Sequence, residues 1–137
     1  MSEKTFRLEV ITPDRVTLAD DDVVSVVAPG AEGYLGVLAN HAPMMASLGI
    51  GKLNYRRVNG ETGVMALGGG FLEVYDNTAS ILAECAEPAE NIDIARAEES
   101  KKRAKQRLAA GGHDIDVPRA EAALKRAINR LKIAKQP

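Results

Sequence analysis

The residues that favour strands and those that favour helices occupy different parts of this 137-residue chain. Ten of its twelve glycines and ten of its eleven valines lie before residue 88, whereas eleven alanines lie after it. Valine favours extended backbone and glycine favours tight turns, while alanine, lysine and arginine favour helices. We therefore expect a strand-rich domain over residues 1–87 and a helical domain over residues 88–137.

The charged residues divide at the same position. Residues 1–87 hold 6 Lys and Arg against 12 Asp and Glu, a net charge of −6, and residues 88–137 hold 12 against 7, a net charge of +5. The formal net charge of −1 is therefore the sum of an acidic N-terminal part and a basic C-terminal part. Such an asymmetry often indicates a charged partner. A helical segment of this size with a thin apolar stripe is too small to fold alone, so we expect it to be mobile unless it docks elsewhere.

Composition excludes several classes of protein. The hydrophobic content of 45% is too high for a disordered chain, and no apolar run approaches the roughly 20 residues of a membrane span. The charged N-terminus has no apolar signal-peptide segment, and the single cysteine, Cys85, rules out an internal disulfide. We expect a protein of a reducing compartment, with Cys85 packed at the end of a strand.

No pattern typical of catalysis or metal binding is present. His41 and His113 are far apart in the sequence, and no second cysteine or nucleophile motif accompanies them. We interpret Asp20-Asp21-Asp22 as an acidic turn, because no calcium-loop spacing follows. Gly68-Gly69-Gly70 lacks the Lys and the following helix of a phosphate loop, so we interpret it as a crowded bend or bulge.

Short apolar runs with turn signals between them fill the first domain. Phe6, Leu8 and Val10 alternate with polar residues, as in a half-buried strand, and Asn59-Gly60 between two apolar runs predicts a hairpin. Many short strands at close spacing predict an antiparallel sandwich or barrel.

The pattern of residues 88–137 predicts two helices. The first is expected over residues 91–110, with an inward stripe of Ile94, Ala97, Ala104 and Leu108. Gly111-Gly112 would end it, and Asp116 would cap the second helix. The apolar face of that helix is predicted to hold Val117, Ala120, Leu124, Ile128 and Leu131.

Each predicted helix carries arginines at spacings of 7 and 4 residues, on one face. They are Arg96, Arg103 and Arg107 in the first helix and Arg119, Arg126 and Arg130 in the second. Like charges at these spacings repel weakly, and a guanidinium group suits phosphate, so a polyanion is one candidate ligand. A solvated face partly paired with Glu98, Glu99 and Glu121 is the other interpretation. A nucleic-acid-binding adaptor is a third, although residues 1–87 are acidic and residues 88–137 contain no Phe, Tyr or Trp for stacking.

Several stretches, in this order and spacing, indicate a family. They are Val10-Ile11-Thr12-Pro13-Asp14-Arg15, Pro29-Gly30-Ala31-Glu32-Gly33-Tyr34-Leu35-Gly36-Val37-Leu38, His41-Ala42-Pro43-Met44-Met45, Leu67-Gly68-Gly69-Gly70-Phe71-Leu72-Glu73-Val74, Ile81-Leu82-Ala83-Glu84 and Ile92-Asp93-Ile94-Ala95-Arg96-Ala97. With them the chain resembles, over essentially its whole length, the epsilon subunits of F-type ATP synthases.

The resemblance implies an α+β architecture, with an N-terminal antiparallel β-sandwich of about ten strands and a C-terminal α-helical hairpin. It implies a non-catalytic subunit of the central stalk that couples rotation in the proton-translocating synthase. Its partners would be the gamma subunit and the c-ring, and the alpha and beta subunits when the hairpin extends to inhibit ATP hydrolysis. It would be peripheral, on the cytoplasmic face of the cell membrane, with no membrane insertion and no nucleic-acid partner.

The resemblance also implies a regulatory ATP site in the compact hairpin, with or without magnesium. Ile92, Asp93, Arg96 and Ala97 match the family's nucleotide motif, Glu87 matches a flanking acidic position, and Arg103, Arg126 and Arg130 match basic positions around the phosphates. Glu32, Tyr34 and His41 would belong to the rotor interface. Tyr34 stands where many relatives have an acidic or polar residue, and Ala39-Asn40 replaces a common Pro-Gly.

Overall fold

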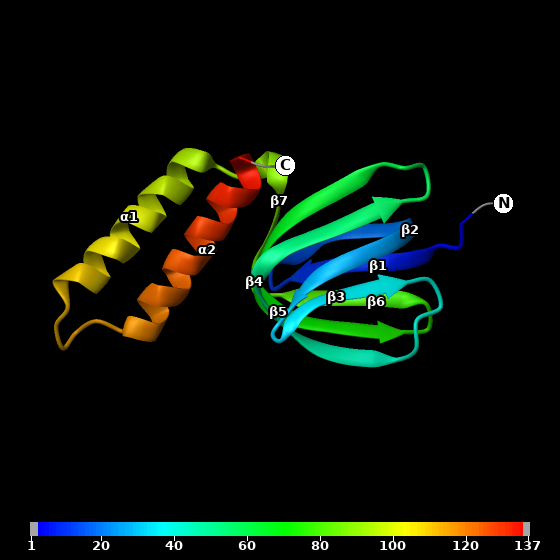
Figure 1. Cartoon of the computed structure of the whole chain (residues 1–137), viewed down its shortest axis with the longest axis horizontal. Coiled ribbons are helices and arrows are strands. Elements are labelled where there is room, and N and C mark those ends of the chain that lie inside the picture. The colour runs from blue at the N-terminus through cyan, green and yellow to red at the C-terminus, as the bar shows by residue number, and fades with distance from the viewer. Residues whose placement is uncertain (1–2, 136–137) are drawn as a thin grey trace.

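The computed structural model describes residues 3–135 and contains a strand domain followed by two helices (Figure 1). The strands are β1 (Phe6–Thr12), β2 (Arg15–Gly30), β3 (Gly33–Leu38), β4 (Met44–Arg57), β5 (Thr62–Tyr75), β6 (Thr78–Ala83) and β7 (Ala86–Pro88). A 3₁₀ turn, η1 (Ala89–Asn91), leads to α1 (Ile94–Ala110) and α2 (Val117–Lys135). The predicted α+β architecture, a sandwich followed by a helical hairpin, is confirmed.

The strands form one sheet that closes on itself. Their order is β1-β6-β5-β4-β2-β3, β1 also pairs with β2, and β7 pairs with β5. All pairings are antiparallel except that of β1 with β6. Closure into a flattened barrel leaves fewer unpaired strand edges than an open sheet would.

The described residues form seven strands where we predicted about ten, because three strands are long enough to serve both layers. β2 spans 16 residues, and β4 and β5 span 14 each. The first half of β2 pairs with β1 and the second half with β3 and β4, with register shifts where the strand changes partner. The sequence runs that suggested separate short strands are thus segments of continuous bent strands.

The predicted alternation of apolar and polar residues in β1 is confirmed by the core of the sandwich. Phe6, Leu8 and Val10 are buried on the inner face of β1, and the intervening residues are half-buried. They join a cluster that includes Leu53, Leu67, Leu72 and Ile81, each almost completely buried. One contiguous apolar core therefore holds both layers of the sandwich together.

The turns match their residues, with one correction. Asn59-Gly60 lies in the turn between β4 and β5, with Gly60 at φ 90°, so the predicted hairpin is confirmed. The acidic run Asp20–Asp22 is not a turn: it lies within β2, where Asp20 and Asp22 pair with Arg57 and Asp21 pairs with Arg7. Ion pairing across strands makes an acidic run compatible with extended backbone.

The Gly68-Gly69-Gly70 stretch lies in the middle of β5 and is crowded, as predicted. A Cβ atom on Gly68 would lie 2.1 Å from the Sγ of Cys85, and one on Gly70 would lie 2.1 Å from the carbonyl oxygen of Leu82. Gly70 also has a φ of 146°, which disfavours any other residue. Cys85 is half-buried between β6 and β7, close to the strand end where we placed it.

The helix ends are close to prediction, but the buried faces differ from it. Asp93 caps α1 and Asp116 caps α2 with side-chain hydrogen bonds of 3.0 and 3.1 Å, and Gly111 ends α1. Helix α1 begins at Ile94 rather than at residue 91, because η1 and the cap precede it. Ile94, Val117 and Ile128, which we predicted to face inward, are 44%, 46% and 43% exposed.

Four other residues of the predicted inward faces, Ala97, Ala104, Ala120 and Leu131, are buried as expected. The buried residues are Ala97 and Ala104 on α1 and Ala120, Ala127, Leu131 and Ile133 on α2. Figure 1 shows α2 lying between α1 and the sandwich, and α2 contacts β4 and β5. Within residues 3–135, neither helix is both long enough and apolar enough to cross a membrane.

Candidate functional site

A pocket of about 430 Å³ lies where the hairpin meets the sandwich. Strand β2, strand β7, the 3₁₀ turn and both helices contribute to it. Its lining residues are Arg15, Glu87, Asn91, Asp93, Arg96, Ala97, Ser100 and Arg130. Five of the eight residues predicted to bind nucleotide are therefore brought together here.

The first turn of α1 forms one wall of the pocket. Asp93 accepts a 3.0 Å hydrogen bond from the backbone amide of Arg96, so its carboxylate caps the helix. Arg96, Ala97 and Ser100 follow at positions 3, 4 and 7 after the cap, on one helical face. The cap therefore fixes the direction in which the predicted motif presents its side chains.

An ion pair joins the sandwich to α2 at the opposite wall. Arg130 Nε donates a hydrogen bond to Glu87 Oε1, and both side chains are partly buried. Arg130 Nη2 also lies 3.7 Å from the Sγ of Cys85. Because Glu87 belongs to β7 and Arg130 to α2, this pair exists only when the helix is docked.

The charges around the pocket favour an anion. Among residues 3–135, no carboxylate oxygen lies within 4.0 Å of the guanidinium nitrogens of Arg15 or Arg96. The carboxylate of Glu87 is paired with Arg130 and that of Asp93 caps α1. Guanidinium groups of this kind bind phosphate oxygens through paired, charge-assisted hydrogen bonds.

Three predicted nucleotide-binding residues lie outside the pocket lining. Ile92 is 9% exposed and packs with Ala66 and Ile133, so it joins the motif to the docked end of α2 rather than lining the pocket. Arg103 is exposed and donates a 3.4 Å hydrogen bond to the hydroxyl of Ser100. Arg126 lines a neighbouring hollow.

That second hollow lies between the helices, toward the loop that joins them. It measures about 500 Å³ and its charged lining residues are Arg107, Asp114, Asp116, Arg119 and Arg126. Its arginines are the remaining members of the two faces found in the sequence, apart from Arg103. Glu98, one of the acidic residues considered as their partners, forms its ion pair with Lys135 instead, at 3.3 Å.

Sequence reasoning missed Arg15, Asn91 and Ser100. Ser100 lies four residues after Arg96, so helical spacing indicates it, whereas Asn91 lies in the 3₁₀ turn before the helix cap, where this spacing does not apply. Arg15 follows the first turn of the sandwich, 72 or more residues before the other lining residues. Only closure of the tertiary structure brings it to the pocket.

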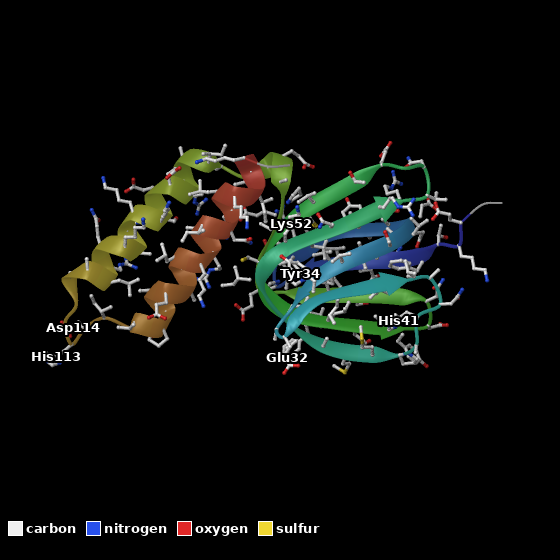
Figure 2. The ribbon with its side chains drawn as sticks, viewed as in Figure 1. Glu32, Tyr34, His41, Lys52, His113 and Asp114 are labelled. Carbon is white, nitrogen blue, oxygen red and sulfur yellow. The ribbon has the colours of Figure 1, made fainter. Side chains whose placement is uncertain are left out.

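The predicted rotor-interface residues fall into two places. Glu32 and the 65% exposed Tyr34 line a hollow of about 570 Å³ beside β3 and β4. His41 follows the other end of β3 and is half-buried, with Nδ1 2.7 Å from the carbonyl oxygen of Ala42. Figure 2 shows Glu32 and His41 at separate ends of the sandwich surface.

Metal binding finds no support in residues 3–135, where no group of three His, Cys, Asp or Glu side chains has the geometry to hold an ion. His113 lies at the tip of the hairpin, far from His41 (Figure 2). The two histidines therefore cannot act on one substrate in this arrangement.

Comparison with protein families gives two matches that cover the chain in sequence. Residues 5–89 match the beta-sandwich domain of the ATP synthase delta/epsilon chain, and residues 90–135 match the long alpha-helix domain of the same chain. The ATP synthase epsilon chain of Syntrophomonas wolfei is 47% identical over 137 residues, covering 100% of this chain and 99% of that one. The epsilon chain of Pelotomaculum thermopropionicum is 54% identical over 109 residues, 80% of each chain.

Two solved structures share the fold. A chain in the mitochondrial ATP synthase of Euglena gracilis, in an assembly of OSCP, F1 and c-ring, matches with a TM-score of 0.81 at 24% identity, over 96% of this chain and 82% of that chain. A chain in the central stalk and c-ring of the Tetrahymena thermophila mitochondrial ATP synthase matches with a TM-score of 0.59 at 19% identity, over 99% and 98%. At these identities the likeness concerns the fold.

Proposed function

Because the chain belongs to the ATP synthase delta/epsilon chain family, we propose that it is a non-catalytic subunit of the central stalk whose hairpin binds ATP when docked on the sandwich. In this role the sandwich attaches to the rotor and transmits its rotation. The hairpin is the regulatory part, which hinders ATP hydrolysis when it extends toward the alpha and beta subunits.

The pocket between hairpin and sandwich is the observation that carries the ATP proposal. Its volume of about 430 Å³ is within the usual range for small-molecule sites. Arg96 and Arg130 supply positive charge for the phosphates, and Asp93 and Ala97 supply a polar and an apolar surface for the remainder of the nucleotide. Arg103 and Arg126, which lie outside this lining, would reach the phosphates through their long side chains.

Binding at this pocket would act as a switch. Its walls come from β2, β7, α1 and α2, so a ligand that contacts all of them binds the docked hairpin better than an extended one. A ligand shifts such an equilibrium only through its difference in affinity for the two states. Abundant ATP would therefore keep the hairpin docked, and scarcity of ATP would release it to inhibit hydrolysis.

The positive charge of α2 would also favour binding of the extended hairpin to an acidic partner. Helix α2 contains Arg119, Lys125, Arg126, Arg130, Lys132 and Lys135, against a single acidic residue, Glu121. A basic helix of this kind is complementary to an acidic segment on a partner, and we propose the beta subunit as that partner.

Partners and location follow from the same premise. We propose that the sandwich binds the gamma subunit and the c-ring, with Glu32, Tyr34 and His41 in the surface facing the ring. The subunit would then be peripheral, on the cytoplasmic face of the membrane. Co-purification of gamma and c subunits with a tagged chain tests this, and recovery of the chain without either subunit would contradict it.

Calorimetric titration of ATP into the isolated full-length protein, with and without magnesium, tests the ATP proposal. We expect saturable binding that is lost or strongly weakened by Arg126→Ala combined with Arg130→Ala. An Arg56→Ala variant, whose side chain pairs with Glu3 on the sandwich surface, controls for loss of positive charge. If the wild type shows no saturable ATP binding, or if the double variant binds ATP as well as the wild type does, the proposed regulatory role is wrong.

The motif aspartate needs two variants because it also caps α1. Asp93→Ala removes both the cap and any contact with the nucleotide, whereas Asp93→Asn keeps a good capping residue. Weaker ATP binding by both variants would identify a contact with the nucleotide. Weaker binding by Asp93→Ala alone would assign the effect to the helix cap. A titration with short duplex DNA at low salt tests the adaptor alternative, for which we expect no binding.

A further inference from the structure

Arg15 is the one cation of the pocket lining that the sandwich contributes. It is the first residue of β2, whereas Arg96 belongs to α1 and Arg130 to α2. The other pocket residue from the sandwich strands is Glu87, which is negatively charged and already paired with Arg130. Arg15 therefore brings positive charge to the pocket from a third direction.

A tight turn holds the backbone of Arg15 in place. Thr12 and Arg15 are paired across the turn between β1 and β2. The Thr12 hydroxyl lies 2.8 Å from Asp14 Oδ1 and 3.2 Å from the carbonyl oxygen of Arg15. The turn positions the residue through its backbone, so its long side chain stays available for another partner.

No carboxylate of the described residues forms an ion pair with this guanidinium, although the charge of Arg15 helps, after the Thr12 hydrogen bond, to lower the pKa of the neighbouring Asp14 carboxyl. Asp14 accepts the hydrogen bond from Thr12, and none of its oxygens lies within 4.0 Å of an Arg15 nitrogen. Other arginines of the sandwich contrast with this, since Arg7, Arg56 and Arg57 each pair with at least one acidic residue. An arginine on the lining of a pocket that has no carboxylate within 4.0 Å of its guanidinium is suited to bind an anionic ligand.

We propose that Arg15 binds the phosphate groups of the nucleotide, so that the ligand is held from three sides by the sandwich, α1 and α2. This inference rests on the ATP site proposed above and adds to it a residue outside the sequence motif. It also gives a physical reason for coupling. The phosphates link a group fixed on the sandwich to groups on both helices, and undocking the hairpin separates those groups.

One alternative is that Arg15 is an exposed, solvated arginine whose removal does not change ATP binding. Another alternative is that Arg15 supports docking of the hairpin without touching the ligand. The first predicts no effect on binding. The second predicts an equal effect on every ligand that requires the docked hairpin, whatever its number of phosphates.

The experiment is calorimetric titration of ATP and of AMP into the full-length wild type and into Arg15→Ala, Arg15→Lys and Arg56→Ala. We expect Arg15→Ala to weaken ATP binding about tenfold, since one charge-assisted contact is lost, and to weaken AMP binding by a smaller factor. Arg15→Lys keeps the charge without the planar fork, so its ATP affinity should fall between those of Arg15→Ala and wild type. Arg56→Ala, which removes the same charge from the far surface, should bind ATP like the wild type.

A second readout follows the hairpin itself. Amide hydrogen exchange in α2 should slow as ATP is added, and Arg15→Ala should require about tenfold more ATP for the same protection. Thermal unfolding without nucleotide should be unchanged by this substitution, because the side chain is exposed.

The titrations distinguish failure of the proposed role of Arg15 from failure of the proposed ATP site. If wild type binds ATP and Arg15→Ala binds it equally well, or weakens ATP and AMP by the same factor, the role of Arg15 is overturned while the ATP site stands. If wild type shows no saturable ATP binding, both the site and this inference are overturned.

Discussion

The sandwich and the hairpin bury side chains of very different size. The most deeply buried residues of the sandwich include Leu8, Leu53, Leu67, Leu72 and Ile81. Four of the six buried residues of the two helices are alanines, and the other two, Leu131 and Ile133, lie near the end of α2. Alanine lets two helices approach closely but removes little apolar surface from water.

This difference indicates which part of the molecule opens first. Burial of large side chains makes the sandwich the stable unit, and the helical pair depends on its contact with the sandwich for much of its stability. That contact consists of a small apolar cluster around Ile92 and Ile133, the Arg130–Glu87 pair and the hydrogen bonds of Asn129. Four predictions test the comparison, in order of decreasing effect.

The largest effect is expected in the core of the sandwich. Leu72→Ala should lower the free energy of unfolding by about 2–5 kcal/mol, because it leaves a cavity in a fully buried position. Urea denaturation followed by circular dichroism measures this. Leu82→Ala is the control, since Leu82 is 51% exposed and should change stability much less. Equal effects of the two variants would contradict the assigned core.

The crowded junction of sandwich and hairpin should give the next effect. A Cβ introduced by Gly68→Ala would lie 2.1 Å from Cys85 Sγ and 3.2 Å from the Cδ of Arg126 on α2. Overpacking of this kind costs about 1–3 kcal/mol, measured by denaturation, and should also loosen the hairpin.

A cycle with the neighbouring side chain identifies the cause of that cost. Cys85→Ala in the same chain should recover part of the lost stability, because it removes the colliding sulfur. Gly36→Ala is the matched control, since a Cβ there meets nothing within 4 Å. A Gly68→Ala protein as stable as Gly36→Ala would show that the close contact does not constrain the junction.

Loss of the Asn129 contacts should affect the hairpin alone. Asn129 Nδ2 donates to the carbonyl oxygens of Gly51 at 2.9 Å and of Leu67 at 3.5 Å. Asn129→Ala should weaken docking by about 1 kcal/mol, and Asn129→Asp should weaken it more because a carboxylate would face two carbonyl oxygens.

Amide hydrogen exchange measures this prediction region by region. Exchange should become faster in α2 while the strands remain protected. Ile128→Ala, at the adjacent and 43% exposed position, is expected to leave both rates unchanged. Faster exchange throughout the sandwich would mean that the two regions unfold together, which would break the comparison.

The smallest effect concerns the first turn of the sandwich. The hydrogen bond from the Thr12 hydroxyl lowers the pKa of the Asp14 carboxyl below its ordinary value. Folding therefore favours the ionised form, and its contribution to stability is present above the unfolded pKa and lost as the pH falls through the folded one. Thr12→Val should raise the pKa of Asp14 in an NMR titration. An unchanged titration curve would rule out this hydrogen bond in solution.

Much of the fold is predictable from local pattern. Alternation of apolar residues located β1, Asn59-Gly60 located the turn between β4 and β5, and Asp116 located the start of α2, because each signal acts over a few residues. The number of strands was not predictable, since a bent strand such as β2 and two shorter strands have the same local pattern. The inward faces of the helices were predicted in part: Ala97, Ala104, Ala120 and Leu131 are buried, whereas Ile94 and Ile128 are exposed.

The candidate site divides in a similar way. Asp93, Arg96 and Ala97 lie within one helical turn, so spacing alone places them together on the pocket wall. Ile92 was assigned to the ligand, yet it packs with Ala66 and Ile133 instead. Burial of that kind depends on residues distant in the chain, which spacing does not reveal.

By itself, the sequence determined the two-part architecture, the opposite charges of its parts, the helix caps and the arginine faces. Propensity, capping and helical spacing depend on residues that are close together in the sequence, so these features can be predicted from the sequence alone. Only the tertiary structure decided that Arg15 meets Glu87, Arg96 and Arg130 around one pocket, and that Ile94 and Ile128 stay exposed beside the buried alanines. Those outcomes depend on how the sheet closes and how α2 docks against it, through contacts between residues far apart in the sequence.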